Sequence, residues 1–353
     1  MIDTEGAQIS APKLGVYAGT EESHNRAQAT ANTVAGAAGA ITVGMNAAIA
    51  DNDARNLANI VGGGELKAST SLKIMAYGTA TASATIYGMD IGGVSVNASF
   101  ATAVLRARQE ATLTESHVDA GSITAKSFFN ADDASAQSAQ ARLYTGGGAL
   151  INVRVNVAVA YARSQSDAGL RPGSIHATGS IDILTKGCAN TLAEVANMGG
   201  ISEISAALSA AYAYGQSGFN AFLVVPDDAS RELEADAGNV TVKADTTSAV
   251  KAVLTPSAAG VDVAKYNVKV NVAVAQNSTG INAYLSGTGA MKANAVIIEA
   301  TGIATAEATV KKPAVSGGLA NVAANAMAAT LDASQKAYID TISLTAGSVT
   351  VTS

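Results

Sequence analysis

The chain is poor in several residue types that particular classes of protein need. Of its 353 residues, 14% are charged and 4% are aromatic, and it has no Trp and a single Cys, Cys188. One cysteine excludes an internal disulfide framework and any zinc site built from several cysteines. A net charge of −6 provides no basic surface for nucleic acid or for an anionic membrane. We therefore expect no nucleic-acid partner, and the sequence indicates no cofactor.

Targeting and membrane signals are missing as well. The first residues, Met1–Glu5, are acidic and polar, and no apolar segment typical of a secretory signal follows them. Apolar runs such as Val157–Ala162 are far shorter than the ~18 residues that a membrane-spanning helix needs. The sequence thus predicts no membrane insertion. Because Val349–Ser353 stop inside a strand-like pattern, we expect the chain to be an excised segment of a longer protein that lacks its own export signal.

What the chain has in abundance is Ala and Val in a repeated arrangement. Hydrophobic residues make up 48% of it, which is not the profile of a disordered segment. A large apolar residue followed two positions later by Ala recurs seven times, and successive copies start 52 to 58 residues apart. The alanines of this motif are Ala11, Ala68, Ala120, Ala177, Ala235, Ala293 and Ala346.

Two further motifs keep their order within each unit. A pair of alternating apolar residues follows the Ala after a short gap, as Ile181 and Ile183 follow Ala177, often with a Gly such as Gly179 between them. This is the pattern of strand, tight turn and strand. A second Ala, two residues before Ile or Leu, closes each unit. These alanines are Ala58, Ala111, Ala168, Ala221, Ala283 and Ala337.

An asparagine column lies in the middle of the units. Asn46, Asn97, Asn156, Asn271 and Asn325 each have a Val three residues earlier, and the remaining unit has Ile204 and Ala207 there. In Val268–Ala275 the large apolar residues share one face of a strand, while Lys, Asn and Ala share the other. The Asn side chains either form a hydrogen-bonded ladder along a stack or occupy turns. Their place inside the Val alternation favours the ladder.

These patterns predict an all-β protein, a β-solenoid (β-helix) of about six ~57-residue repeats in a single domain, 1–353. One wide coil per repeat, or two unequal coils, fits the spacing. The Ala columns require a narrow interior, because a larger side chain there would overpack the core. Short helical turns are expected in loops, at Asp51–Ile60 and Asp227–Leu233. The approximate units are 9–65, 66–117, 118–174, 175–232, 233–290 and 291–343, with a partial unit at 344–353.

Few residues are candidates for chemistry. His24, His117 and His176 fall in different registers, and we interpret them as solvated side chains rather than metal ligands. We expect Cys188 to be a small buried thiol without a base beside it. The sequence therefore indicates no catalytic or metal-binding residue. Phe222, Tyr284 and Tyr338 occupy one column and form either a packing strip or an aromatic strip that faces carbohydrate.

Three segments resemble known repeats. They are Val268–Ala275, the Asn277-Ser278-Thr279 that leads to Asn282-Ala283-Tyr284-Leu285, and the turn and strand at Gly238–Ala244. In pattern and composition, nearly the whole chain resembles very large bacterial filamentous adhesins. The closest are the leukotoxin-like adhesins, among the filamentous haemagglutinin-like and autotransporter passengers. The resemblance implies a secreted or cell-surface β-solenoid without common catalytic residues.

The first hypothesis is therefore a non-enzymatic structural or adhesive stalk of a giant bacterial filament. Its partners would be neighbouring segments of the same protein or further copies joined end to end, and a glycan or protein on a host or bacterial cell. The alternative is a β-helical protein that binds or processes polysaccharide, which would need acidic or basic residues converging on one groove. Surface or ice binding through Thr arrays ranks last, because Thr79 and Thr81 are an isolated pair.

Overall fold

The structure consists of β-strands. The computed structural model describes residues 1–133, 136–226, 233–255, 262–311 and 316–353, and within these ranges the chain forms strands and no helix. Strand pairing is parallel throughout the described segments, in two sheets. The prediction of an all-β fold is thus confirmed. The stretch Ala206–Ala213, which helix propensity alone would permit to be helical, lies in a strand.

The smaller sheet has seven strands. In spatial order they are β1 (Ile2–Asp3), β4 (Arg55–Val61), β6 (Arg108–Thr114), β10 (Gln165–Arg171), β15 (Gly218–Val225), β18 (Gly280–Gly287) and β22 (Ser334–Asp340). Each strand hydrogen-bonds to the one before and the one after it in this order. The spatial order is also the sequence order, so each later segment is added on the same side of the sheet.

The larger sheet has sixteen strands. In sequence order they are β2 (Gln8–Ala18), β3 (Asn25–Asn52), β5 (Glu65–Leu105), β7 (His117–Ala120), β8 (Ile123–Phe129), β9 (Ala139–Ala162), β11 (Ser174–Ala177), β12 (Ile181–Cys188), β13 (Thr191–Asn197), β14 (Gly200–Gly215), β16 (Leu233–Thr255), β17 (Asp262–Asn277), β19 (Ala290–Val310), β20 (Ser316–Gly317), β21 (Ala320–Leu331) and β23 (Ser343–Thr352).

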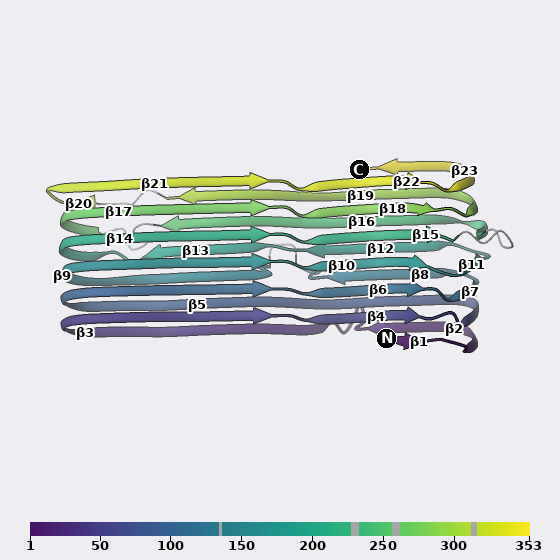
Figure 1. Cartoon of the computed structure of the whole chain (residues 1–353), viewed down its shortest axis with the longest axis horizontal. Helices are drawn as coiled ribbons and strands as arrows, with labels where there is room; N and C mark the ends of the chain where they lie inside the picture. Colours follow the sequence, from purple (N-terminus) through teal and green to yellow (C-terminus); the bar gives the residue numbers. More distant parts are fainter. Residues whose placement is uncertain (134–135, 227–232, 256–261, 312–315) are drawn as a thin grey trace.

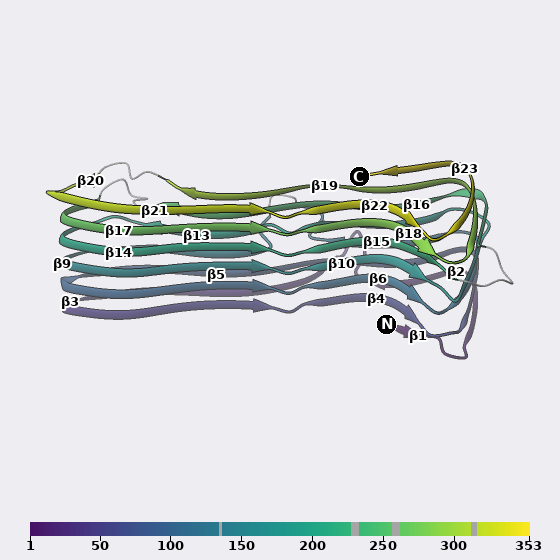
Figure 2. The ribbon, with the colours of Figure 1, turned by 45° about the horizontal axis from the view of Figure 1, so that its top comes forward.

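The chain runs out along one layer and back along another. Residues 139–145 of β9 pair with β13, whereas residues 149–162 pair with β14, so β9 passes from the first layer to the second at one end of the molecule (Figure 1). We call the layer of β8, β12 and β13 the outgoing layer, and the layer of β10, β14 and β15 the return layer. Figure 2 shows the two layers one behind the other, with long strands that run side by side and bend near one end of the molecule. Each passage lies directly on the previous one.

The space between the layers holds two apolar clusters. One contains Leu and Ile from the outgoing layer, including Leu72 and Ile181, against alanines of the return layer such as Ala168. The other is lined mainly by Ala on both sides, for example Ala141 and Ala160, both fully buried. Layers that carry Ala on both inner faces approach more closely than the ~10 Å usual for packed sheets. Cα atoms of β14 in the return layer lie within 8 Å of Cα atoms of β16 in the outgoing layer, so the narrow interior expected from the alanine columns is present.

The helical turn expected at Asp51–Ile60 is absent, and that prediction is wrong. β3 extends to Asn52 and β4 begins at Arg55, and residues 55–60 pair with residues 108–113 of β6. Pairing with the next passage determines the backbone conformation here, and it overrides any local helical preference. Of the second expected turn, Asp227–Leu233, only Leu233 belongs to the described residues, and it starts β16.

Candidate functional site

The predicted alanine column is continuous. Ala11, Ala68, Ala120, Ala177, Ala235, Ala293 and Ala346 are Cα partners of one another in that order. Where the side chains are described in the middle of the stack they are buried, as at Ala68, Ala120 and Ala177. The closing alanines pair in the same way, from Ala58 to Ala337. The sequence spacing therefore identified true spatial neighbours.

The asparagine column needs a correction at Asn97. Its Cα partners are Gly44 and Arg154, not Asn46 and Asn156. The column that contains Asn46 continues through Ser99, Asn156, Ser209, Asn271 and Asn325. A sequence signal was present. Asn97 lies 14 residues before its closing alanine, Ala111, whereas the other Asn residues lie 12 before theirs, and Ser99 restores the spacing of 12.

Hydrogen bonds along this column form a ladder only in part. The Asn271 Nδ2 donates to the Asn325 Oδ1 at 2.8 Å, as a ladder requires. The Asn156 Nδ2 instead donates across the interior to the Thr145 Oγ1 at 2.9 Å and to the Asn197 Oδ1 at 3.0 Å. Asn156 has Ser above and below it, and a serine side chain is too short to extend an amide ladder. Cross-layer bonds take the ladder's place there.

Charged side chains are buried beside this column. Asp90, Arg154 and Lys269 have no more than 9% of their surface exposed. The Asn97 amide donates to the Asp90 carboxylate, and the Arg154 Nη2 donates to the Gly147 carbonyl oxygen at 2.8 Å. Burial lowers the pKa of Arg154 and that of Lys269, with nearby Arg154 lowering the latter further. This end of the interior is polar, in contrast to the alanine-lined middle.

The predicted aromatic residues do form a strip on the outside of the return layer. Phe222, Tyr284 and Tyr338 are Cα partners, and their rings stack with centroids 5.6 Å and 5.2 Å apart and interplanar angles of 17° and 5°. The guanidinium of Arg171 lies 4.9 Å from the centroid of the Phe222 ring. The rings therefore cover one another's faces. A sugar ring stacks on a free aromatic face, so this geometry favours the packing interpretation over a carbohydrate platform.

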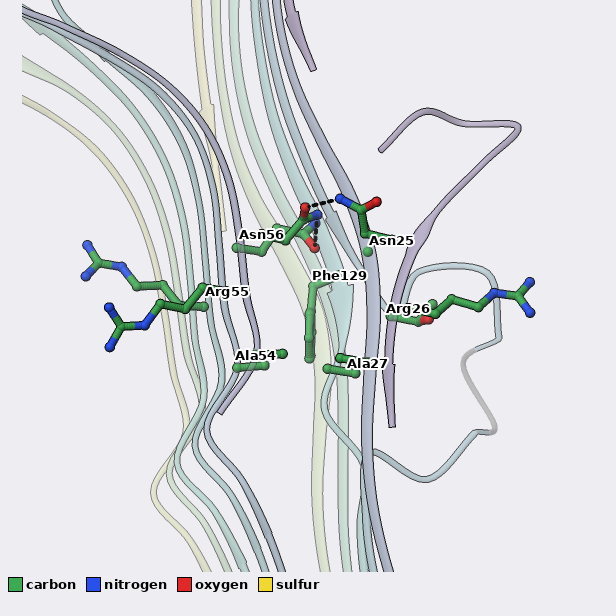
Figure 3. Close-up of a pocket in the computed structure, with 13 residues that line it drawn as sticks. Asn25, Arg26, Ala27, Ala54, Arg55, Asn56 and Phe129 are labelled. Atoms are coloured by element: carbon green, nitrogen blue, oxygen red, sulfur yellow. Dashed lines mark hydrogen bonds between the residues drawn. The ribbon is translucent and has the colours of Figure 1, made fainter. Parts of the chain in front are cut away.

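A cavity of about 270 Å³ opens between the layers at the N-terminal end of the stack (Figure 3). Phe129 lies between the layers, and the Asn25 Nδ2 donates to the Asn56 Oδ1 across the gap at 2.6 Å. Arg26 and Arg55 point away from the cavity on opposite sides. Their charges are thus directed to solvent. Besides these arginines, Arg108 and Phe129, the lining consists of small and amide side chains and contains no acidic residue or histidine.

A separate groove of about 420 Å³ lies on the outside of the return layer. Its lining contains Arg106, Arg108 and Arg163 and no acidic residue. Arg106 pairs with Asp51 at 2.6 Å and Arg108 pairs with the buried Glu110, whereas no ion-pair partner of Arg163 occurs among the described residues. The floor is open at Gly218, where an added Cβ would have no neighbour closer than 4.0 Å. Among the three arginines of the groove, Arg163 is therefore the one available to a carboxylate from outside the described chain.

Amides beside the groove are oriented by one buried carboxylate. The Gln165 Nε2 and the Asn220 Nδ2 donate to the two oxygens of Asp167, at 2.6 Å and 2.7 Å. Burial raises the pKa of Asp167, while these two hydrogen bonds lower it. Because the Gln165 nitrogen is engaged by Asp167, its oxygen is the atom left to accept from a ligand. The groove thus combines guanidinium donors with an amide acceptor.

The histidines and the cysteine lie apart from this groove. The His24 Nδ1 lies 2.7 Å from Asp132, and the His176 Nδ1 lies 3.0 Å from Asp119, so two of the three histidines have a carboxylate partner that the sequence did not indicate. The His117 Nδ1 lies 2.8 Å from the Ser174 hydroxyl. Burial raises the pKa of the Cys188 thiol to about 11, which is the opposite of what a nucleophile requires.

No group of three or more His, Cys, Asp or Glu is arranged to hold a metal ion in the ranges that the structure covers. Within the same ranges, no helix is long and apolar enough to cross a membrane. Comparisons with protein-family models, curated proteins and solved structures found no match to the chain.

Proposed function

We propose that the chain is a β-solenoid of about six ~57-residue repeats that serves as a non-enzymatic structural and adhesive stalk segment. The observation that carries this proposal is the register of the alanine columns, in which every member lies on its counterpart in the next passage. In such a stack each passage contacts only its neighbours, so stability and length grow together as units are added. That property suits a rigid extended filament.

The two ends of the stack support this role. The edge strands β3 at one end and β21 at the other carry the same column, with Asn46 and Asn325 as equivalent members. An open strand edge favours pairing with another strand. We therefore propose that a neighbouring segment, or a second copy, continues the stack head to tail.

The adhesive part of the proposal is supported by the arginine groove. Guanidinium groups bind carboxylates in a paired geometry, and an amide oxygen accepts from hydroxyl groups. A glycan carrying both groups fits this lining better than a neutral one does. Together with the resemblance to filamentous adhesins, this supports a secreted or cell-surface location and contact with a glycan or protein on another cell.

A cysteine cross-linking experiment tests the head-to-tail stack. Ser10 and Thr345 are exposed members of one outward column, at opposite ends of the chain. In-register stacking of two copies brings them to neighbouring-strand distance, about 4.8 Å between Cα atoms, which a disulfide spans. The double variant S10C/T345C is expected to give linked oligomers under mild oxidation, because native Cys188 is buried.

The matched control is S10C/T350C. Thr350 lies in a different column, whose first member is Gly15, so correct stacking keeps it away from residue 10. The proposal predicts a ladder of linked oligomers for S10C/T345C and little linkage for the control. Equal yields from both variants, or no linkage at concentrations at which electron microscopy shows fibres, would refute the head-to-tail stack.

A further inference from the structure

The return layer carries a wholly apolar outer surface near the end where the chain reverses. It is formed by five alternate positions on each of six neighbouring strand segments, which we call the apolar face. Its members are residues 41, 43, 45, 47 and 49; 94, 96, 98, 100 and 102; 151, 153, 155, 157 and 159; 204, 206, 208, 210 and 212; 266, 268, 270, 272 and 274; and 320, 322, 324, 326 and 328.

None of these residues is charged, and Thr102 is the least apolar. The larger members are exposed on the outside, with 41% of Leu208, 49% of Val268 and 79% of Met45 accessible. Their sequence neighbours, such as Ser209 and Asn271, point inward and are buried. The Val alternation seen in the sequence is therefore the outer side of the strand, and the Asn side is the interior.

The opposite outer surface has a different character. On the outgoing layer, Arg142 pairs with Glu194 at 3.1 Å and Lys251 pairs with Glu307 at 3.5 Å, across neighbouring strands. Charges of both signs are typical of a surface that faces water. The apolar face has no such pairs. The contrast between the two surfaces identifies the apolar face as the one that another apolar surface covers.

The area of the apolar face matches a stable protein interface. Five alternate residues span ~33 Å along a strand and six strands span ~29 Å, which gives roughly 950 Å². The largest apolar patch of an ordinary monomer covers about 300–600 Å². A specific interface buries about 800 Å² on each partner. The face is thus large enough to form a whole interface by itself.

We propose that the apolar face packs against the same face of a second copy. The two copies are related by a two-fold axis that lies between their apolar faces. The axis runs along the strands, over the segment of Val153, Val155 and Val157. Two nearly straight sheets pack face to face in this way without needing complementary charges. This lateral pairing is distinct from the head-to-tail stack and goes beyond the proposed function.

The side chains are complementary under this axis. It places the segment of Val96–Phe100 of one copy opposite the segment of Ala206–Ala210 of the other, with columns kept in line. Ala98 then faces Leu208, and Phe100 faces Ala210. Large residues thus lie opposite small ones where the second and fourth passages meet, which favours close packing at that contact.

Charge substitutions at one facing pair test the proposal. The variants A98K and L208E each place one charge in the interface, and each is expected to weaken dimerisation at least tenfold in sedimentation equilibrium of the full chain. In the double variant A98K/L208E, every new Lys faces a new Glu of the other copy, so dimerisation is expected to recover in part. The variant A98K/L208K offers no such pairing and is expected to stay monomeric.

Controls separate this contact from other associations. The variant S83K changes the charged surface of the outgoing layer and is expected to leave dimerisation unchanged. Linkage through S10C/T345C reports the head-to-tail stack independently.

Three outcomes would overturn the proposal. The first is a monomeric wild-type chain at high concentration, and the second is S83K acting as strongly as A98K. The third is a monomer that binds phosphatidylcholine vesicles, with the binding lost in A98K. The apolar face would then be covered by lipid and not by a second copy. Failure of A98K/L208E to recover more than A98K/L208K would refute the stated axis.

Discussion

Replacing Ala160 with Leu tests the closeness of the two layers most directly. Ala160 is fully buried, and its stack neighbours Ala103 and Ala213 are also fully buried alanines. The facing layer is lined by alanines such as Ala141. The larger side chain has no free volume above, below or across from it. It must either separate the layers or take a strained rotamer.

The expected cost is substantial. Overpacking a well-packed core costs typically ~1–3 kcal/mol, and we expect A160L to reach the upper part of this range because no neighbour in the column can be compressed. Urea unfolding followed by circular dichroism measures the change in the free energy of unfolding. The control A38L makes the same substitution at an exposed alanine of the first passage, outside the apolar face, and is expected to change stability by less than about 0.5 kcal/mol.

An A160L variant as stable as the wild type would refute the close approach of the two layers. That result would mean that the layers are far enough apart to accept a leucine, and the alanine columns would then have no steric role. A loss of stability in A38L equal to that in A160L would also count against a steric role of the alanine columns, because the effect would then not arise from burial.

Three more predictions concern single side chains. The variant N271A removes the donor to Asn325 and is expected to lower the free energy of unfolding by about 1–2 kcal/mol in urea titrations, more than N325A does, because Asn271 is the more buried partner. The Cys188 thiol, with its pKa raised to about 11, is expected to react with a thiol reagent at pH 8 only after denaturant is added; rapid reaction of the folded chain would contradict its burial. Burial, aided by Glu21, raises the pKa of Tyr77 to about 12. The folded chain thus holds this proton more tightly than the unfolded chain, whose tyrosine titrates near 10, so the stabilisation is complete below pH 10 and is lost as the pH rises towards 12. The variant Y77F should lose less stability over that interval, and equal losses would exclude Tyr77 as the cause.

Much of the fold can be predicted from the sequence, because every stacked unit places the same steric limit on side-chain size at the same position. The alanine columns were predicted correctly from spacing alone, since a narrow interior selects Ala at each passage. Asn97 was misplaced because the Asn-Ala-Ser order at 97–99 put the amide two residues before its column, on the same side of the strand. A shift of two residues keeps a side chain on the same face of the strand. The alternation of apolar and polar residues is unchanged by such a shift, so it could not reveal the misplacement.

The sequence did not specify which side of the Val strands faces inward. Hydropathy alone would place Val153 and Val155 in the core and Arg154 outside. The structure has the reverse arrangement, because the alanines later in the same strand, Ala158 and Ala160, must lie inside and the alternation has a period of two. The arginine groove was also missed, because Arg106, Arg108 and Arg163 come together only when two passages are stacked.

Apolar side chains on one face of each return strand alternate with polar and small side chains on the other, so the register of each return strand is critical. Deleting a single residue between Ala149 and Val153 would shift the remainder of the strand by one position. Its valines would then point between the layers, and Arg154 and Asn156 would point to solvent. Loss of a complete unit of some 57 residues, by contrast, would leave every surviving side chain on its proper side. Such a gene tolerates changes in the number of whole units far better than it tolerates a one-codon deletion within a strand.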